Sequence, residues 1–173
     1  MQDKTYAEQL KGLFIKAKEE LGYPIVLGLQ IYDKPGDDEK PSETDYPFVG
    51  YNIMSQRRVA NIQFSEEKER DIHIWWEEQY EFILSFVAVA ESPYDSLEAA
   101  KELFEWLSIK GQDYMSEKQI VFISATPITN RDFLLINNYE RRNGFDCRLR
   151  MGRRIEKDKP MIEKVFVSSG EFV

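Results

Sequence analysis

The sequence predicts an α+β protein: a mostly antiparallel, mixed β-sheet packed by two main α-helices. Two segments, at 5–21 and 91–111, have apolar residues at helical spacing, and the remaining apolar segments alternate as strands do. The strand segments follow one another in hairpin-like succession, without the strict strand–helix alternation of a parallel sheet. A chain of 173 residues with 42% hydrophobic residues is long enough for one sizeable core. We therefore treat residues 1–173 as a single domain.

The first helix is predicted over residues 5–21. Thr5 and Glu8 have the spacing of a capping box, and Gly22 followed by Pro24 marks the end of the helix. The spacing of three and four residues predicts one buried face, made of Tyr6, Leu10, Leu13, Phe14, Ala17 and Leu21.

The first group of strands is predicted at 24–32, 48–54 and 58–65. Between them, the segment DKPGDDEKPSETDYP at 33–47 is rich in proline and charge and is interpreted as a solvated loop. The acidic EEKER at 66–70 is interpreted as a turn between strands.

The second group begins with alternating segments at 71–78 and 80–90, the latter apolar on both faces towards Ala90. A helix follows, with Ser92 as its cap, Pro93 in its first turn and Gly111 at its end. Its predicted apolar face is Leu97, Ala100, Leu103, Phe104 and Leu107. Further strands are predicted at 120–127, 144–152 and 161–167. In the strand at 144–152, Phe145, Cys147, Leu149 and Met151 should face the core, and Asp146, Arg148 and Arg150 should face away from it.

Composition and charge exclude several classes of protein. The formal net charge is −8 with a pI near 4.9, which argues against a protein that coats DNA. The longest apolar run, at 82–90, is too short to span a bilayer, and the charged N-terminal residues are unlike a secretion signal. A single cysteine fits a reducing compartment. We expect a soluble protein of the cytosol.

No catalytic motif is present in the sequence, so we expect no enzymatic activity, no cofactor and no metal. His73 is the only histidine, and as a strand residue without a partner motif it is interpreted as structural. Cys147 lies on the apolar side of its strand and is interpreted as a buried, inert thiol. The acidic residues at 37–39 lack the spacing of a calcium loop.

The distribution of arginine is the most informative feature. Six of the ten arginines lie between Asn137 and Arg154, in the stretch NNYERRNGFDCRLRMGRR. Up to Asn130 the chain has 13 Lys+Arg against 24 Asp+Glu, and from Arg131 onward it has 10 against 7. This local change could serve nucleic acid, a phosphorylated substrate or other copies of the chain, or it could be a merely solvated strand face.

The acids that alternate with these arginines favour contacts to carboxylates. Glu140 and Asp146 lie among them, and Glu156 and Asp158 follow closely. Planar, weakly hydrated guanidinium groups suit bidentate bonds to carboxylates and suit protein interfaces better than lysine does. We therefore predict a subunit or partner interface made of Arg131, Asp132, Glu140, Arg141, Arg142, Asp146, Arg148 and Arg150.

The run TNRDFLLINNYERRNGFDCRLR at 129–150 resembles the signature region of the phage neck or tail terminator proteins of tailed bacteriophages and prophages. The elements that carry the resemblance are Asn130-Arg131-Asp132, Tyr139–Arg142 and Gly144-Phe145-Asp146. EEQYEFILSF at 77–86 and the helix after it are similar to the central strand and helix of the family. The first helix and GYPIVLGLQ also fit, whereas residues 33–69 have no matching pattern.

The resemblance implies a structural virion protein at the neck, present in the host cytoplasm during assembly. It implies a ring, usually a hexamer, that caps the tail tube, ends its polymerisation and joins it to the head–tail connector. Phage DNA would pass through the ring without specific binding, since an acidic wall repels phosphates. The alternatives are another head- or tail-completion protein of the neck and a cytosolic nucleic-acid-binding module.

Overall fold

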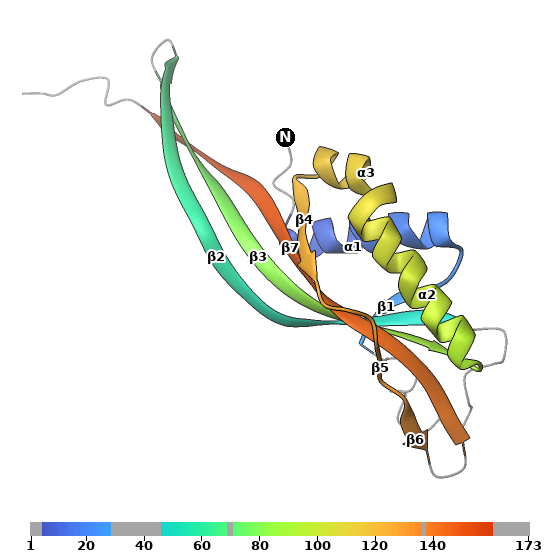
Figure 1. Cartoon of the computed structure of the whole chain (residues 1–173). Coiled ribbons are helices and arrows are strands. Elements are labelled where there is room, and N and C mark those ends of the chain that lie inside the picture. Colours follow the sequence, from blue (N-terminus) through green and yellow to red (C-terminus); the bar gives the residue numbers. More distant parts are fainter. Residues whose placement is uncertain (1–4, 29–45, 69–70, 136–137, 161–173) are drawn as a thin grey trace, which may run out of the picture.

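The fold is a single curved sheet with three helices on one of its faces (Figure 1). The computed structural model describes residues 5–28, 46–68, 71–135 and 138–160, with the side chains of 67–72, 133–140 and 157–160 outside that description. The predictions that lie wholly or partly outside these residues are the strand continuation at 29–32, most of the loop at 33–47, the end of the turn at 66–70 and the strand at 161–167.

The strands form a mixed sheet in the order β1-β2-β3-β7-β4, with two short strands, β5 and β6, that also pair with β7. β1 is parallel to β2, and the other pairs are antiparallel. This arrangement confirms the predicted α+β class and the mostly antiparallel, mixed sheet. The bounds are β1 Ile25–Leu27, β2 Phe48–Lys68, β3 Asp71–Ala90, β4 Ile120–Ala125, β5 Thr129–Asn130, β6 Phe133–Leu135 and β7 Asn138–Pro160.

The first helix, α1 (Tyr6–Leu21), begins and ends as predicted. Thr5 and Glu8 form the capping box, and Gly22 ends the helix in the left-handed conformation at φ 83°. Four residues of the predicted face, Leu10, Leu13, Phe14 and Ala17, are buried. The sequence pattern therefore predicted this element at both ends and on its inner face.

The second helical region is more complex than the predicted single helix. α2 (Pro93–Glu105) continues as a π-helical turn over Trp106–Lys110, which ends at Gly111, and α3 (Gln112–Glu117) follows. Gly111 is needed there, because a Cβ atom at this position would lie 2.9 Å from the Trp106 carbonyl oxygen. The short helix α3 was not predicted.

The predicted apolar face of α2 is wrong at Leu97, whose exposed fraction is 39%. The position before it, Ser96, is buried instead, because its hydroxyl accepts a hydrogen bond from the Asn143 side chain on β7 at 2.8 Å. The buried face thus runs through Ser96, Ala99, Ala100, Leu103, Trp106 and Leu107. A pattern based on hydrophobic residues could not predict this buried Ser96–Asn143 pair.

The predictions of separate strands at 48–54 and 58–65, and at 71–78 and 80–90, are also wrong. Each pair is one continuous strand, β2 and β3. In β2, register shifts after Ile53 and after Arg58 interrupt the alternation without ending the pairing with β3. Residues 66–68 of the predicted EEKER turn belong to β2, with Lys68 opposite Asp71.

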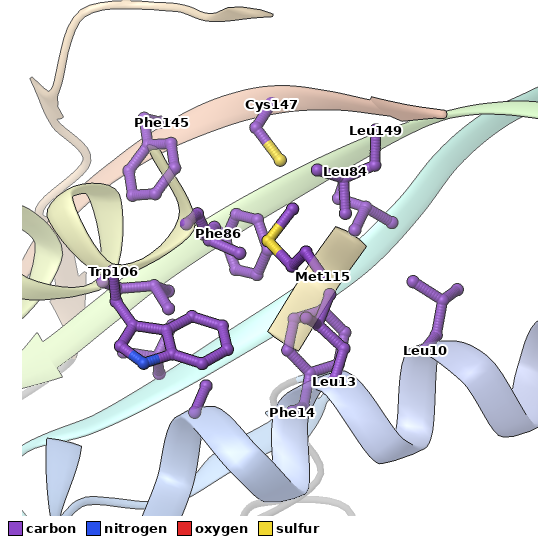
Figure 2. Packing of buried hydrophobic residues seen from close by; sticks show 14 of the residues in the cluster. Leu10, Leu13, Phe14, Leu84, Phe86, Trp106, Met115, Phe145, Cys147 and Leu149 are labelled. Atoms are coloured by element: carbon purple, nitrogen blue, oxygen red, sulfur yellow. The ribbon is translucent and has the colours of Figure 1, made fainter. Parts of the chain in front are cut away.

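The core lies between the helices and the sheet (Figure 2). Leu10, Leu13 and Phe14 of α1 point towards the sheet, and Met115 of α3 lies between them and Phe86. Phe145, Cys147, Leu149 and Met151 of β7 are all at most 2% exposed, which confirms their predicted inward direction. The buried indole of Trp106 donates a hydrogen bond to the Glu20 carboxylate at 2.7 Å and so joins the π-helical turn to α1.

Beyond the helices, β2, β3 and β7 continue together as a three-stranded extension, which we call the arm (59–68, 71–79 and 152–160; Figure 1). Phe64 stacks on Trp75 with ring centroids 5.5 Å apart, and the Arg154 guanidinium lies 4.4 Å from the Trp75 ring centre. These contacts hold the strands of the arm together in a region that none of the described helices covers.

Candidate assembly interface

The face of the sheet opposite the helices is lined with charged side chains. Because successive strand residues point to opposite faces, the outward neighbours of the buried β7 residues are Asp146, Arg148 and Arg150. No helix of the described residues covers this face (Figure 1). We call it the bare face, and it is where most of the predicted interface residues lie.

On the bare face, Glu81 of β3 is held by one arginine from each neighbouring strand. Its Oε2 accepts from Arg57 Nη2 of β2 at 2.6 Å, and its Oε1 accepts from Arg150 Nη2 of β7 at 2.9 Å. The Glu81 side chain is only 5% exposed. The hydrogen bonds from Arg150 and then Arg57 lower the pKa of Glu81 below its ordinary value, so the carboxylate stays charged.

Glu78 of β3 is held in the same way, on the helix-covered face. Its carboxylate accepts from Arg58 Nη1 of β2 at 3.3 Å and from Arg153 Nη2 of β7 at 3.0 Å. The Arg153 guanidinium also lies 4.9 Å from the ring centre of Tyr6 on α1. The two glutamates therefore fasten the three central strands on both faces, at the point where the arm leaves the body.

Arg131 crosses β7 on the bare face. Its backbone N–H donates to the Arg142 carbonyl oxygen, and its guanidinium donates to the Ser85 hydroxyl at 2.7 Å and to Asp146 at 3.0 Å. Burial by itself would raise the pKa of Asp146, but the hydrogen bonds from Ser85 and Arg131 outweigh it and lower the pKa. Arg131 thus ties the segment after β4 to both β7 and β3.

Asp132 binds two residues near the start of β7, Arg141 and Arg142. Its Oδ1 accepts from the Arg142 backbone N–H at 2.7 Å, and its Oδ2 accepts from Arg141 Nη1 at 3.0 Å. The backbone hydrogen bond is the largest cause that lowers the pKa of Asp132. The side chain of Asn130 in turn accepts from the Asp132 backbone N–H at 2.9 Å. The Asn-Arg-Asp triplet therefore has a structural role within the chain.

The structure brings together most of the predicted interface residues as pairs inside one chain: Arg131 with Asp146, Arg141 with Asp132, and Arg150 with Glu81. Arg142 contributes its backbone to Asp132. Arg148 is exposed. The side chain of Glu140 lies outside the described part. These pairs bear out the preference of the arginines for carboxylates, while contact with a neighbouring subunit stays a prediction.

The sequence pattern did not identify the two most buried acids, Glu78 and Glu81, or three of the arginines that bind them, Arg57, Arg58 and Arg153. A signal existed, since Arg57 and Arg58 are the first arginines in a chain that until then uses only lysine. Their partners could not be identified, because strand pairing across 20 or more residues is set by the sheet register.

Few side chains in the described part of the chain are of the types that act in catalysis or bind metals. Cys147 is buried, and burial raises the pKa of its thiol, in agreement with the interpretation as an inert core residue. His73 lies on β3 and is partly exposed. Within the described residues, no three His, Cys, Asp or Glu side chains are grouped to hold a metal, and no helix is long and apolar enough to cross a membrane.

These features define an α+β protein with a one-sided helical layer and a sheet fastened by arginine–carboxylate pairs. The family model of the phage neck terminator protein matches residues 20–171. The chain belongs to this family, a family of structural proteins of the bacteriophage neck, and is thus a virion protein. A search of curated proteins found no match.

We expect that only glycine at position 144 leaves room for the Arg131 side chain to cross β7. A Cβ atom there would clash with the Phe86 carbonyl oxygen and lie 3.0 Å from Arg131 Cδ. Gly144→Ala should therefore lower the free energy of unfolding by roughly 1–3 kcal/mol or more, measured by urea denaturation. The matched control is Gly152→Ala on the same strand, where the nearest atom would be 3.6 Å away and stability should change by less than about 1 kcal/mol. Equal losses in both variants would contradict this role of Gly144.

Stability is expected to fall at acidic pH through Glu81, Asp132 and Asp146. Their pKa values are lowered in the folded chain, so their contribution is complete above the ordinary values of 4.5 and 3.8 and is lost as pH falls through the folded values. Glu81→Gln should lower the midpoint of urea denaturation at pH 7. The midpoint of this variant should also decline less between pH 7 and pH 3 than that of the unmodified chain. Urea denaturation curves recorded at several pH values measure both effects.

The control for this measurement is Glu98→Gln, which alters an exposed pair with Lys101 on α2. Its midpoint should follow that of the unmodified chain across the same pH range. A Glu81→Gln variant whose midpoint declines as steeply as that of the unmodified chain would disprove the role of Glu81.

Proposed function

We propose that this phage neck terminator protein forms a ring, hexameric as the resemblance implies, that caps the tail tube. The ring ends polymerisation of the tube protein and joins the tail to the head–tail connector. The observation that carries this proposal is the family match over residues 20–171. The protein acts as a structural component, without catalysis, cofactor or metal.

The charge arrangement of the bare face supports a contact with proteins rather than with DNA. Three of its arginines, Arg57, Arg131 and Arg150, are bound to carboxylates of the same chain. Each pair largely cancels its own charge, so these arginines offer little net positive potential to a phosphate backbone. Paired guanidinium groups retain planar surfaces that pack well in protein interfaces. We infer that the predicted interface residues contact a neighbouring subunit or ring from this face.

Arg148 is the residue best suited to test the interface. It is exposed on the bare face, so its replacement should leave the monomer folded. Arg148→Glu should at least halve the fraction of tail tubes with a capped end, because it places an acid where a partner carboxylate is expected. The assay polymerises the tube protein of the same virus with each variant and measures tube lengths and caps by electron microscopy.

The control for the capping assay is Lys11→Glu, the same charge reversal at an exposed position of α1. It should cap tubes as the unmodified chain does. If the unmodified chain leaves tube ends uncapped and lengths unlimited, the proposed function fails. Binding to the connector without binding to tube ends would instead identify a head-completion protein.

The protein is expected to bind duplex DNA weakly and without sequence preference. Its net charge is −8, and its clustered arginines are accompanied by acids. Fluorescence anisotropy with a short duplex should detect no binding near physiological salt. Sub-micromolar binding with a log–log salt slope of several units, at roughly −0.9 per phosphate contact, would favour the nucleic-acid-binding module instead.

A further inference from the structure

The bare face carries more arginines than carboxylates on the body of the sheet. Arg57 of β2 and Arg150 of β7 share a single carboxylate, that of Glu81. Arg148 precedes Arg150 by two residues and so lies on the same face, where it is exposed. Among the described residues Arg148 has no ion-pair partner. We call Arg57, Arg148 and Arg150 the arginine patch. Its excess of cations is local and suits one or two carboxylates of a protein partner.

The arm carries an exposed acid on the same face. Glu77 of β3 lies four residues before Glu81, so both side chains point to the bare face. Within the described part of the chain, Glu77 has no ion-pair partner either. Next to it lie Ile62, opposite Glu77 on β2 and 54% exposed, and the stacked rings of Phe64 and Trp75. We call Ile62, Phe64, Trp75 and Glu77 the arm patch. An acid among exposed apolar side chains indicates a contact surface.

The arginine patch has apolar neighbours of the same kind. Arg148 is opposite Ile83 of β3, and Arg150 is opposite Val121 of β4, which is 50% exposed. Opposite residues of paired strands point to the same face. Contact between the two patches would therefore bring apolar side chains together around an ion pair of Glu77 with Arg148. Removal of water by these side chains strengthens the attraction between the two charges.

The two patches of one chain are too far apart to bind each other. Arg148 lies opposite Ile83, and Ile83 is six residues from Glu77 along β3, which corresponds to about 20 Å at roughly 3.3 Å per residue. The sheet also bends towards its helices, so the bare face lies on the outer side of the bend (Figure 1). Two outward-bent faces meet best in one region. This shape favours contact of the arm patch of one copy with the arginine patch of another, instead of a symmetric dimer that uses both patches twice.

We propose that Glu77 of each subunit binds Arg148 of the next subunit, with the arm patch of one copy packed against the arginine patch of its neighbour. The occupant of each patch is a second copy of this chain, because the chain carries both charges of the pair on one face and cannot join them within itself. A contact between two different surfaces is head-to-tail, and such contacts close into a ring when the rotation between copies suits it. This inference rests on the proposed function, since it specifies how neighbouring subunits of the ring are joined.

Exchange of the two charges tests the pair directly. Glu77→Arg and Arg148→Glu should each raise the concentration needed for self-assembly by at least about tenfold, because each places like charges together across the interface. The double variant that carries both changes should assemble close to the concentration of the unmodified chain, because the ion pair is restored with its charges exchanged. Mass photometry of the free protein and electron microscopy of tail-tube ends measure the assembly.

The matched control combines Arg148→Glu with Glu117→Arg, an exposed acid of α3 on the helix side of the sheet. This variant has the same net charge as the exchanged pair, yet its assembly should stay as weak as that of Arg148→Glu alone. Restored assembly in this control would show that net charge, and not the pair, governs the contact, and would overturn the proposal.

The apolar part of the arm patch provides an independent measurement. Ile62→Ser should raise the concentration needed for self-assembly by about tenfold, because an exposed isoleucine that becomes buried in the contact contributes to its stability. Ile109→Ser is the matched control, since Ile109 is 69% exposed but lies in the π-helical turn away from both patches. Its assembly should be unchanged. Equal effects of the two variants would overturn the role of the arm patch.

The outcomes separate the pairing from the proposed function. Rings or capped tubes that form equally well with Glu77→Arg, or that the double exchange fails to restore, would overturn the pairing and leave the function standing. Assembly that stops at dimers would indicate a symmetric contact and also overturn it. Intact rings of Glu77→Arg that no longer bind tube ends would identify the tube protein as the occupant of the arm patch. A chain that stays monomeric in solution and on tube ends would overturn the ring, and the pairing with it.

Discussion

Two glutamates of the central strand fasten this structure. Glu78 and Glu81 of β3 each bind one arginine from β2 and one from β7, on opposite faces of the sheet. A carboxylate that is 5–9% exposed would be strongly destabilising without a partner, so the arginines are required where the glutamates are buried. With their partners in place, the pairs join three strands that come from distant parts of the chain. Within the described residues no helix supports the arm beyond them, so the arm depends on these ion pairs.

The same chemistry explains why arginine replaces lysine in this part of the chain. A guanidinium group can donate several hydrogen bonds in a plane, as Arg131 does to Ser85 and Asp146. An ammonium group of similar reach could not place its donors on both neighbours with that geometry. The change of cation thus accompanies the ion pairs on both faces of the sheet, and on the bare face, which no helix of the described residues covers, these pairs take over part of the role of packing.

Local signals predicted local structure well. The capping box and Gly22 located α1, and strict alternation located the core side of β7 at Phe145, Cys147 and Leu149. Contacts between residues that are far apart in the sequence were predicted less well. The bulges at Met54 and Val59 interrupted the alternation that would have identified β2 as one strand, and the buried Ser96–Asn143 pair shifted the face of α2. Partners such as Arg57 and Glu81 are fixed by sheet register, which a hydrophobic pattern does not contain. The charged stretch was correctly assigned a preference for carboxylates, but the carboxylates proved to be largely those of the same chain.

The length of β7 has a mechanical consequence. Its 23 residues correspond to a contour of roughly 75 Å at about 3.3 Å per residue, so one unbroken backbone runs from the β6 hairpin through the body into the arm. Its hydrogen bonds to β3 lie across the strand direction, along 20 paired positions. Tension applied along β7 would load these bonds in shear, all at once, instead of opening them one after another. A protein built around such a strand resists being stretched along the strand axis, which suits a structural protein of the phage neck.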